Sequence, residues 1–165
     1  MRAYIGIDNG VSGSLALIIP GFTGFKPMPS NKEQSYTKAK AQITRVDWRR
    51  LDITLATWCH YGDESIRVFI ERPFVNPKGF KATVSALRCL EATLISIEKA
   101  RLSYEYVDSR QWQKVLLPKG CKGLDLKTAS RDIGCRLFPE HSVAIKEHKD
   151  ADSLLIAEWA RREGL

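Results

Sequence analysis

The strongest constraint on the fold comes from residues 4–19, in which two short apolar runs flank a segment of Asp, Asn, Gly and Ser. The runs cover residues 4–7 and 15–19, and this pattern predicts a strand, a tight turn and a second strand. Asp8 stands where the first strand ends, so a sheet would hold its carboxylate at an open edge. An aspartate in this place is either a turn former or a carboxylate that binds a ligand.

Glycines in the same segment predict local properties of the backbone. Asn9-Gly10 and Ser12-Gly13 are expected to supply the positive φ angles of a tight hairpin turn. Together with Gly6, these glycines would also let a bulky anion such as a phosphate approach the backbone closely. No helix with an apolar stripe follows them, so the segment does not predict a dinucleotide-binding site.

A second carboxylate repeats the arrangement at Asp8. Residues 66–70 are mostly β-branched or aromatic and predict a buried strand, and Glu71 follows directly, before an Arg-Pro-Phe segment that ends the strand. Glu71 is either an edge residue or a partner of Asp8. If the two strands are neighbours in one sheet, the two carboxylates lie close together, where they repel unless a divalent cation binds between them.

The remaining pattern alternates helices and strands over a chain of 165 residues, which predicts one domain covering residues 1–165. The polar residues 29–40 are expected to form an exposed loop, and Gly62-Asp63 is expected to end the first helix. Further strands are expected at residues 22–28 and 102–107, and helices at residues 47–61, 81–100, 109–117, 126–137 and from 151 onward.

The last segment places acidic residues beside a histidine. From Ala151 onward the chain is rich in helix formers, and acidic residues fall near the first turn, where the helix dipole favours negative charge. Asp150 and Asp152 can therefore be simple helix caps. His148 and Asp152 are four residues apart and would share one helix face, where they form a workable ligand set for a metal ion.

The net charge is +7, and most of the excess lies in one segment. Between Arg110 and Arg136 there are seven basic residues and two acidic ones, with Trp112 and glycines among them. Such a run is either a solvated face or a surface that contacts phosphate groups. The concentration of charge favours a polyanionic partner such as a nucleic acid.

No apolar run approaches the ~20 residues that a membrane span requires, and the N-terminus has no signal-peptide pattern. We therefore expect no membrane partner and a cytoplasmic location. The four cysteines are far apart in the sequence and lack the spacing of a zinc site, which favours free thiols in a reducing cytosol.

Taken together, these features resemble the RuvC family of Holliday-junction resolvases, which belong to the RNase H-like superfamily of nucleases. The resemblance covers roughly residues 1–160 and implies an α/β, RNase H-like fold: a mixed central sheet of about five strands, the first three antiparallel, flanked by helices. The motifs that carry it are Gly6-Ile7-Asp8 with its turn, Ile70-Glu71-Arg72-Pro73-Phe74, the basic region after Trp112, and the segment from Ala151-Asp152 to Ala157.

The resemblance implies a two-metal site that hydrolyses phosphodiester bonds in branched DNA by paired cuts. Family members bind two divalent cations, usually Mg²⁺ or Mn²⁺, at acids that match Asp8, Glu71 and Asp152. Many members place Asp or His three residues before the last acid, where this chain has a lysine. The fourth ligand is then His148, which we favour, or Asp150.

The family also implies how DNA and a second subunit are bound. Phe74 matches an aromatic residue that stacks on bases or wedges between them at the junction crossover, and a core position below the strand is the alternative. Helix 81–100 resembles the family's dimer element, and a two-fold enzyme suits a two-fold junction. The chain is most like phage-borne or organellar members. Contacts to the DNA backbone are implied for Lys114, Lys119, Lys122 and Lys127.

Two alternatives stay open, and a third is excluded by length. A different RNase H-like nuclease would cut forks, flaps or RNA–DNA hybrids, and preference for hybrids would reveal recognition of the 2′-hydroxyl. A non-catalytic module would hold branched DNA for a partner and would bind without cutting. A sugar-kinase-like ATPase has a similar opening, but 165 residues are too few for its two lobes.

Overall fold

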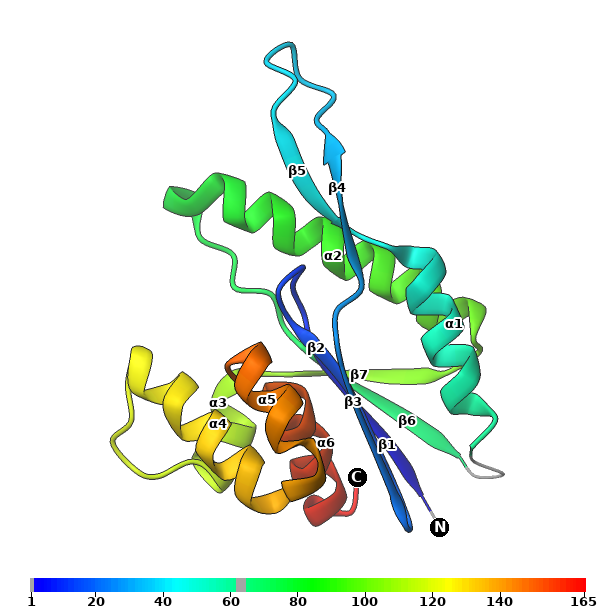
Figure 1. Cartoon of the computed structure of the whole chain (residues 1–165), viewed down its shortest axis with the longest axis vertical. Coiled ribbons are helices and arrows are strands. Elements are labelled where there is room, and N and C mark those ends of the chain that lie inside the picture. Colours follow the sequence, from blue (N-terminus) through cyan, green and yellow to red (C-terminus); the bar gives the residue numbers. More distant parts are fainter. Residues whose placement is uncertain (1, 62–64) are drawn as a thin grey trace.

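The computed structural model describes residues 2–61 and 65–165, and a five-stranded sheet lies at its centre (Figure 1). Its strands are β1 (Ala3–Asp8), β2 (Ser14–Ile19), β3 (Phe22–Pro27), β6 (Ile66–Glu71) and β7 (Ser103–Val107). The strand order is β3-β2-β1-β6-β7. The first three strands are antiparallel, and β6 and β7 run parallel to β1, which confirms the predicted mixed sheet.

Helices cover both faces of this sheet (Figure 1). They are α1 (Trp48–Cys59), α2 (Phe80–Lys99), α3 (Ser109–Leu116), α4 (Leu124–Leu137), α5 (Ser142–His148) and α6 (Asp152–Glu163), with 3₁₀ turns at Pro77–Gly79 and Pro139–His141. Alternate strand residues point to opposite faces. Ile5 and Ile7 therefore pack in the core with α1 and α2, whereas Tyr4 and Ala16 pack in the core with α6.

Gly6 allows α6 to lie directly on β1. A Cβ atom at Gly6 would lie 2.1 Å from the carbonyl oxygen of Ser153 and 2.7 Å from the backbone nitrogen of Ala157, so only glycine fits without a shift of the helix. The expectation that Gly6 admits a phosphate is therefore wrong, because helix backbone fills that space. The expected positive φ angles are also absent at Gly10 and Gly13.

The polar segment expected to be a loop forms a β-hairpin instead. β4 (Ser30–Gln34) pairs with β5 (Gln42–Val46) in a separate two-stranded sheet. Its end is a hydrogen-bonded turn, in which the backbone N–H of Lys40 donates to the carbonyl of Thr37 at 2.9 Å. The hairpin projects beyond the central sheet (Figure 1). Polar strands of this kind lack the apolar alternation by which strands are predicted from sequence.

Three further expectations concern the membrane, the cysteines and the end of α1. Within residues 2–61 and 65–165, no helix is long and apolar enough to cross a bilayer. The expected end of α1 at Gly62-Asp63 lies outside the described residues. The free state predicted for the thiols is confirmed at Cys59, Cys89, Cys121 and Cys135.

Candidate metal centre

Asp8 and Glu71 end two neighbouring parallel strands. In the register of β1 and β6, Ile7 pairs with Ile70, so the two acidic residues follow side by side at the same edge of the sheet. Strand alternation directs both side chains to the face that α3–α6 cover. The structure therefore confirms that the two strands are neighbours. Trp112 of α3 reaches the same place and donates a hydrogen bond from Nε1 to Glu71 Oε2 at 3.3 Å.

His148 and Asp150 reach this edge from the joint between α5 and α6. α5 ends at His148, Lys149 adopts a left-handed conformation with a φ of 85°, and α6 begins at Asp152. Ligand atoms of Asp8, His148 and Asp150 all lie within 4.8 Å of one another. The prediction that His148 and Asp152 share a helix face is wrong, because the helix is interrupted between them. Both candidates for the fourth ligand therefore face the same cluster.

Two buried polar atoms in this cluster lack a hydrogen bond. His148 Nε2 and Asp150 Oδ1 have no hydrogen-bond partner among the described residues, although they lie 3.4 Å from each other. Leaving such atoms unpaired costs roughly 1–3 kcal/mol each. Both residues belong to the group that converges with Asp8, so a cation bound there would supply a partner for donor atoms of this group. The residues present therefore fit a metal ion.

Asp152 lies in the first turn of α6 and is held by Ser130 of α4. Ser130 Oγ donates a hydrogen bond to Asp152 Oδ1 and accepts one from the backbone N–H of Ala151 at 3.1 Å. Neither Asp150 nor Asp152 makes a capping hydrogen bond to the start of α6. Asp152 does lie in the first turn, where the helix dipole favours its charge, and a hydrogen bond from α4 fixes the position of its carboxylate.

Burial and mutual repulsion raise the pKa values of the carboxyl groups. Burial raises the pKa of Asp8 well above its ordinary value, and the charges of Asp152 and Glu71 raise it further. Burial, and then the charge of Asp152, raise the pKa of Glu71 to about 7. Burial, and then the charge of Asp150, raise the pKa of Asp152 to about 6. Burial lowers the pKa of His148. A cation would relieve this repulsion, and carboxylates with one imidazole suit Mg²⁺ or Mn²⁺.

The residues predicted to contact DNA lie at the protein surface. Phe74 follows β6 and is 82% exposed, so the alternative of a core position is wrong. Lys127 Nζ lies 3.5 Å from Asp150 Oδ2, which brings this lysine to the acidic cluster. The remaining predicted lysines are exposed on α3 and on the loop before α4: Lys114, Lys119 and Lys122.

Trp112 and Ser130 contact the site without belonging to any acidic motif. Each makes its contact through one polar atom, the indole Nε1 of Trp112 and the hydroxyl of Ser130. Both residues are fully or almost fully buried. A single sequence does not show that a tryptophan or a serine in a helix contacts an acidic cluster. Only the packing of α3 and α4 brings Trp112 and Ser130 to the carboxylates.

The strand order, the helices on both faces and the acidic edge of the sheet define an RNase H-like fold. Two solved structures of RuvC from Thermus thermophilus share it. One, a complex with Holliday junction substrate, has a TM-score of 0.57 and 13% sequence identity, covering 99% of this chain and 97% of that chain. The other has a TM-score of 0.52 and 15% identity, covering 98% and 96%.

These matches confirm, at the level of the fold, the RuvC resemblance that the sequence motifs indicate. Comparison of sequences alone gives no match to a known protein family and none to a curated protein. A shared fold at such low identity is expected where the sheet and the helix order persist while most side chains differ. The fold alone therefore assigns no role to a side chain, and the roles of the site residues depend on their own geometry.

Proposed function

We propose that the chain is a metal-dependent endonuclease that resolves four-way DNA junctions. One observation carries the proposal: acidic side chains from two strand ends and from the α5–α6 joint converge with a histidine at one edge of an RNase H-like sheet. One of the RuvC structures compared above is a complex with Holliday junction substrate. The proposed unit is one nuclease domain of residues 1–165.

The proposed site holds two divalent cations, Mg²⁺ or Mn²⁺. Asp8, His148 and Asp150 would hold one ion, and Glu71 and Asp152 would extend the donor set to a second. When bound, such ions supply an activated water and stabilise the charge on the leaving 3′ oxygen. The protein residues hold and orient this site. If His148 is not a ligand, its buried imidazole is placed to accept a proton.

The proposed DNA surface surrounds this edge of the sheet. Phe74, 82% exposed, lies three residues beyond Glu71, where its ring can stack on a base at the junction. Lys127, beside Asp150, places positive charge where a phosphate would meet the carboxylates. Contacts with the phosphate backbone are assigned to the exposed lysines of α3 and the following loop: Lys114, Lys119 and Lys122.

The proposed assembly is a homodimer in which α2 contacts a second copy. Leu87 and Ile95 of this helix are 44% and 48% exposed, which leaves apolar surface on the side away from the sheet. Two sites related by a two-fold axis can make paired cuts in a junction with the same symmetry. Light scattering of the purified chain measures the mass, and a monomer at all concentrations would contradict this assembly.

Cleavage of defined substrates tests the proposal. The purified chain is incubated with a four-way junction, a fork, a linear duplex and an RNA–DNA hybrid, with Mg²⁺, with Mn²⁺ or with a chelator. We expect metal-dependent paired cuts in the four-way junction that leave 5′-phosphate and 3′-hydroxyl ends. Preferred cleavage of the fork or the hybrid would support the other RNase H-like activities. Junction binding without cleavage in either metal would support a binding module.

A further inference from the structure

The β4–β5 hairpin is a surface that the proposed active site does not explain. Residues 30–46 contain four basic side chains and one acidic side chain, Glu33, which pairs with Arg45 at 2.7 Å. Within the described residues, no ion pair joins the other three basic residues. They are Lys32, Lys38 and Lys40.

The end of the hairpin is ordered by hydrogen bonds and presents these charges outward. The backbone N–H of Ser35 donates to the carbonyl of Ala41 at 2.7 Å, and a tight turn follows from Thr37 to Lys40. Tyr36 beside the turn is 85% exposed, and Arg88 of α2 lies over its ring at 5.5 Å from the centroid. The turn therefore combines cations with an exposed aromatic ring.

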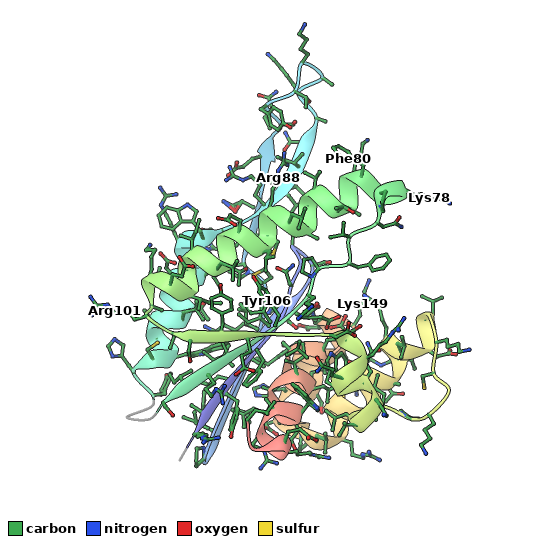
Figure 2. All side chains as sticks on the ribbon, turned by 180° about the vertical axis from the view of Figure 1, so that it is seen from behind. Lys78, Phe80, Arg88, Arg101, Tyr106 and Lys149 are labelled. Atoms are coloured by element: carbon green, nitrogen blue, oxygen red, sulfur yellow. The ribbon has the colours of Figure 1, made fainter. Side chains whose placement is uncertain are left out.

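The hairpin leaves the sheet at the edge that carries the candidate metal centre. Ser14 pairs with Asp8 on one side and with Pro27, the last residue of β3, on the other. β4 begins three residues after Pro27, and the hairpin then projects past α2 (Figure 1). Figure 2 shows the same projection from behind, with Arg88 at the base of the hairpin. Strands of five residues reach about 17 Å at ~3.4 Å per residue, before the turn is counted.

We propose that the β4–β5 hairpin is a second DNA-binding arm, which contacts the phosphate backbone of a duplex segment away from the cleaved phosphates. This inference rests on the proposed function, because it takes DNA as the substrate. A two-stranded ribbon is narrow enough to enter the major groove of B-DNA, which is ~12 Å wide. The lysines of its turn are then available to phosphates on the groove rim.

A second copy of the chain is the alternative binding partner for the hairpin. A cavity of about 660 Å³ lies between the hairpin and α2, and its wall includes Ile43, Trp48 and Ile95. Of these three residues Ile43 belongs to the hairpin, so the apolar part of the hairpin faces this cavity. The turn instead carries Lys38 and Lys40, and two such turns would repel each other at a two-fold contact. Charge therefore assigns the turn to DNA.

Exchange of the two turn lysines tests the inference. The variant Lys38→Gln/Lys40→Asn removes two charges, and asparagine is chosen at Lys40 because its φ of 49° is left-handed. The control Arg2→Gln/Arg101→Asn also removes two charges, from exposed residues just before β1 and β7, and asparagine is again chosen because Arg101 has a left-handed φ of 56°. Because β1, β6 and β7 run parallel, these two residues lie at the end of the sheet opposite to Asp8 and Glu71.

Binding is measured by fluorescence anisotropy with a labelled four-way junction and a linear duplex, without divalent metal, over a range of NaCl concentrations. We expect the hairpin variant to bind both DNAs more weakly, and the slope of log K against log salt to fall by ~0.9 for each phosphate that the arm no longer neutralises. The control variant should keep the affinity and the slope of the unaltered chain.

Three outcomes would overturn the inference. Equal affinity and slope for the hairpin variant and the unaltered chain would show that the arm does not contact DNA. A change of mass from dimer to monomer in light scattering, without a change in DNA affinity per subunit, would assign the hairpin to self-association. Failure of the unaltered chain to bind any DNA would overturn the proposed function together with the arm, so the two failures are distinguishable.

Discussion

Asp8 is the residue on which the proposed chemistry depends most. Asp8→Asn keeps the shape of the side chain but removes the charge that would bind a cation, so junction cleavage in Mg²⁺ should fall by orders of magnitude. Junction binding should be unchanged or tighter, because the substitution removes a negative charge near DNA phosphates. Gel assays of cleavage and anisotropy of binding measure the two effects. Cleavage near the original rate would remove Asp8 from the site.

Asp150 and His148 should both matter, because each contributes a ligand atom to the cluster with Asp8. Asp150→Asn and His148→Ala are each expected to lower the cleavage rate by orders of magnitude. His148→Asp should recover part of the rate, since hard cations accept carboxylate oxygens. Glu147→Gln, an exposed exchange in the last turn of α5, is the matched control and should cleave normally. An active Asp150→Asn variant would assign the ligand role to His148 alone.

At the residue scale, the sequence allows the strand-end acids to be predicted but not the geometry of the α5–α6 joint. Asp8 and Glu71 each follow a short apolar run, and such runs end where a sheet presents its edge. The joint depends on a left-handed backbone at Lys149, although lysine gives no signal for that conformation. A regular helix from His148 to Asp152 is therefore the natural prediction from sequence, and it is wrong.

At the scale of elements, the packing of α6 on β1 depends on Gly6. Gly6→Ala would place a Cβ atom 2.1 Å from the Ser153 carbonyl oxygen, so the helix must move. We expect the free energy of unfolding to fall by about 1–3 kcal/mol. Gly10→Ala is the control, because the nearest atom to its added Cβ lies at 3.8 Å and its φ is not positive. Urea unfolding measures both variants, and equal stability would contradict the close packing.

The loop between α3 and α4 should contribute charge to DNA binding. Replacing Lys119 and Lys122 with Ala should weaken binding to every DNA substrate and lower the slope of log K against log salt by ~0.9 for each phosphate that this loop neutralises. The Arg2→Gln/Arg101→Asn variant removes the same number of charges from outside this basic segment and should bind as the original chain does. An unchanged salt slope would show that this loop only faces solvent.

The main helices and the central sheet follow from periodic apolar patterns, whereas the β4–β5 hairpin does not. α2 is expected at residues 81–100 and lies at Phe80–Lys99. Ser30–Gln34 contains no apolar residue, so its strand character comes from backbone pairing with β5. Pairing between polar strands is a tertiary property, which local propensity does not encode.

At the scale of the whole molecule, metal should stabilise the fold in a pH-dependent way. The raised pKa values of Glu71, about 7, and Asp152, about 6, mean that the metal-free folded chain binds more protons than the unfolded chain at mildly acidic pH. Without metal, this contribution to the free energy of unfolding is lost as the pH rises towards about 7. The lowered pKa of His148 has the opposite effect on the free energy of unfolding. Its contribution is present above the ordinary histidine pKa and is lost as the pH falls.

Cation binding requires these groups to be deprotonated, so all of them favour tighter binding at higher pH. The rise in Tm caused by Mg²⁺, compared with a chelator, should therefore grow between about pH 5.5 and about pH 8. Differential scanning fluorimetry measures this difference at each pH. The Asp8→Asn variant should show little of it. A Tm rise of equal size across the range would contradict a metal centre built from these groups.

The open edge of β4 also bears on aggregation. Within the described part of the chain, β4 pairs with β5 alone, so the backbone groups on its other edge are available to a strand from another molecule. Lys32 and Glu33 place charges along this edge, which hinders the stacking of strands into fibrils. Exchanging these charges for apolar residues would therefore not yield a neutral arm, but a strand edge that seeds insoluble assemblies.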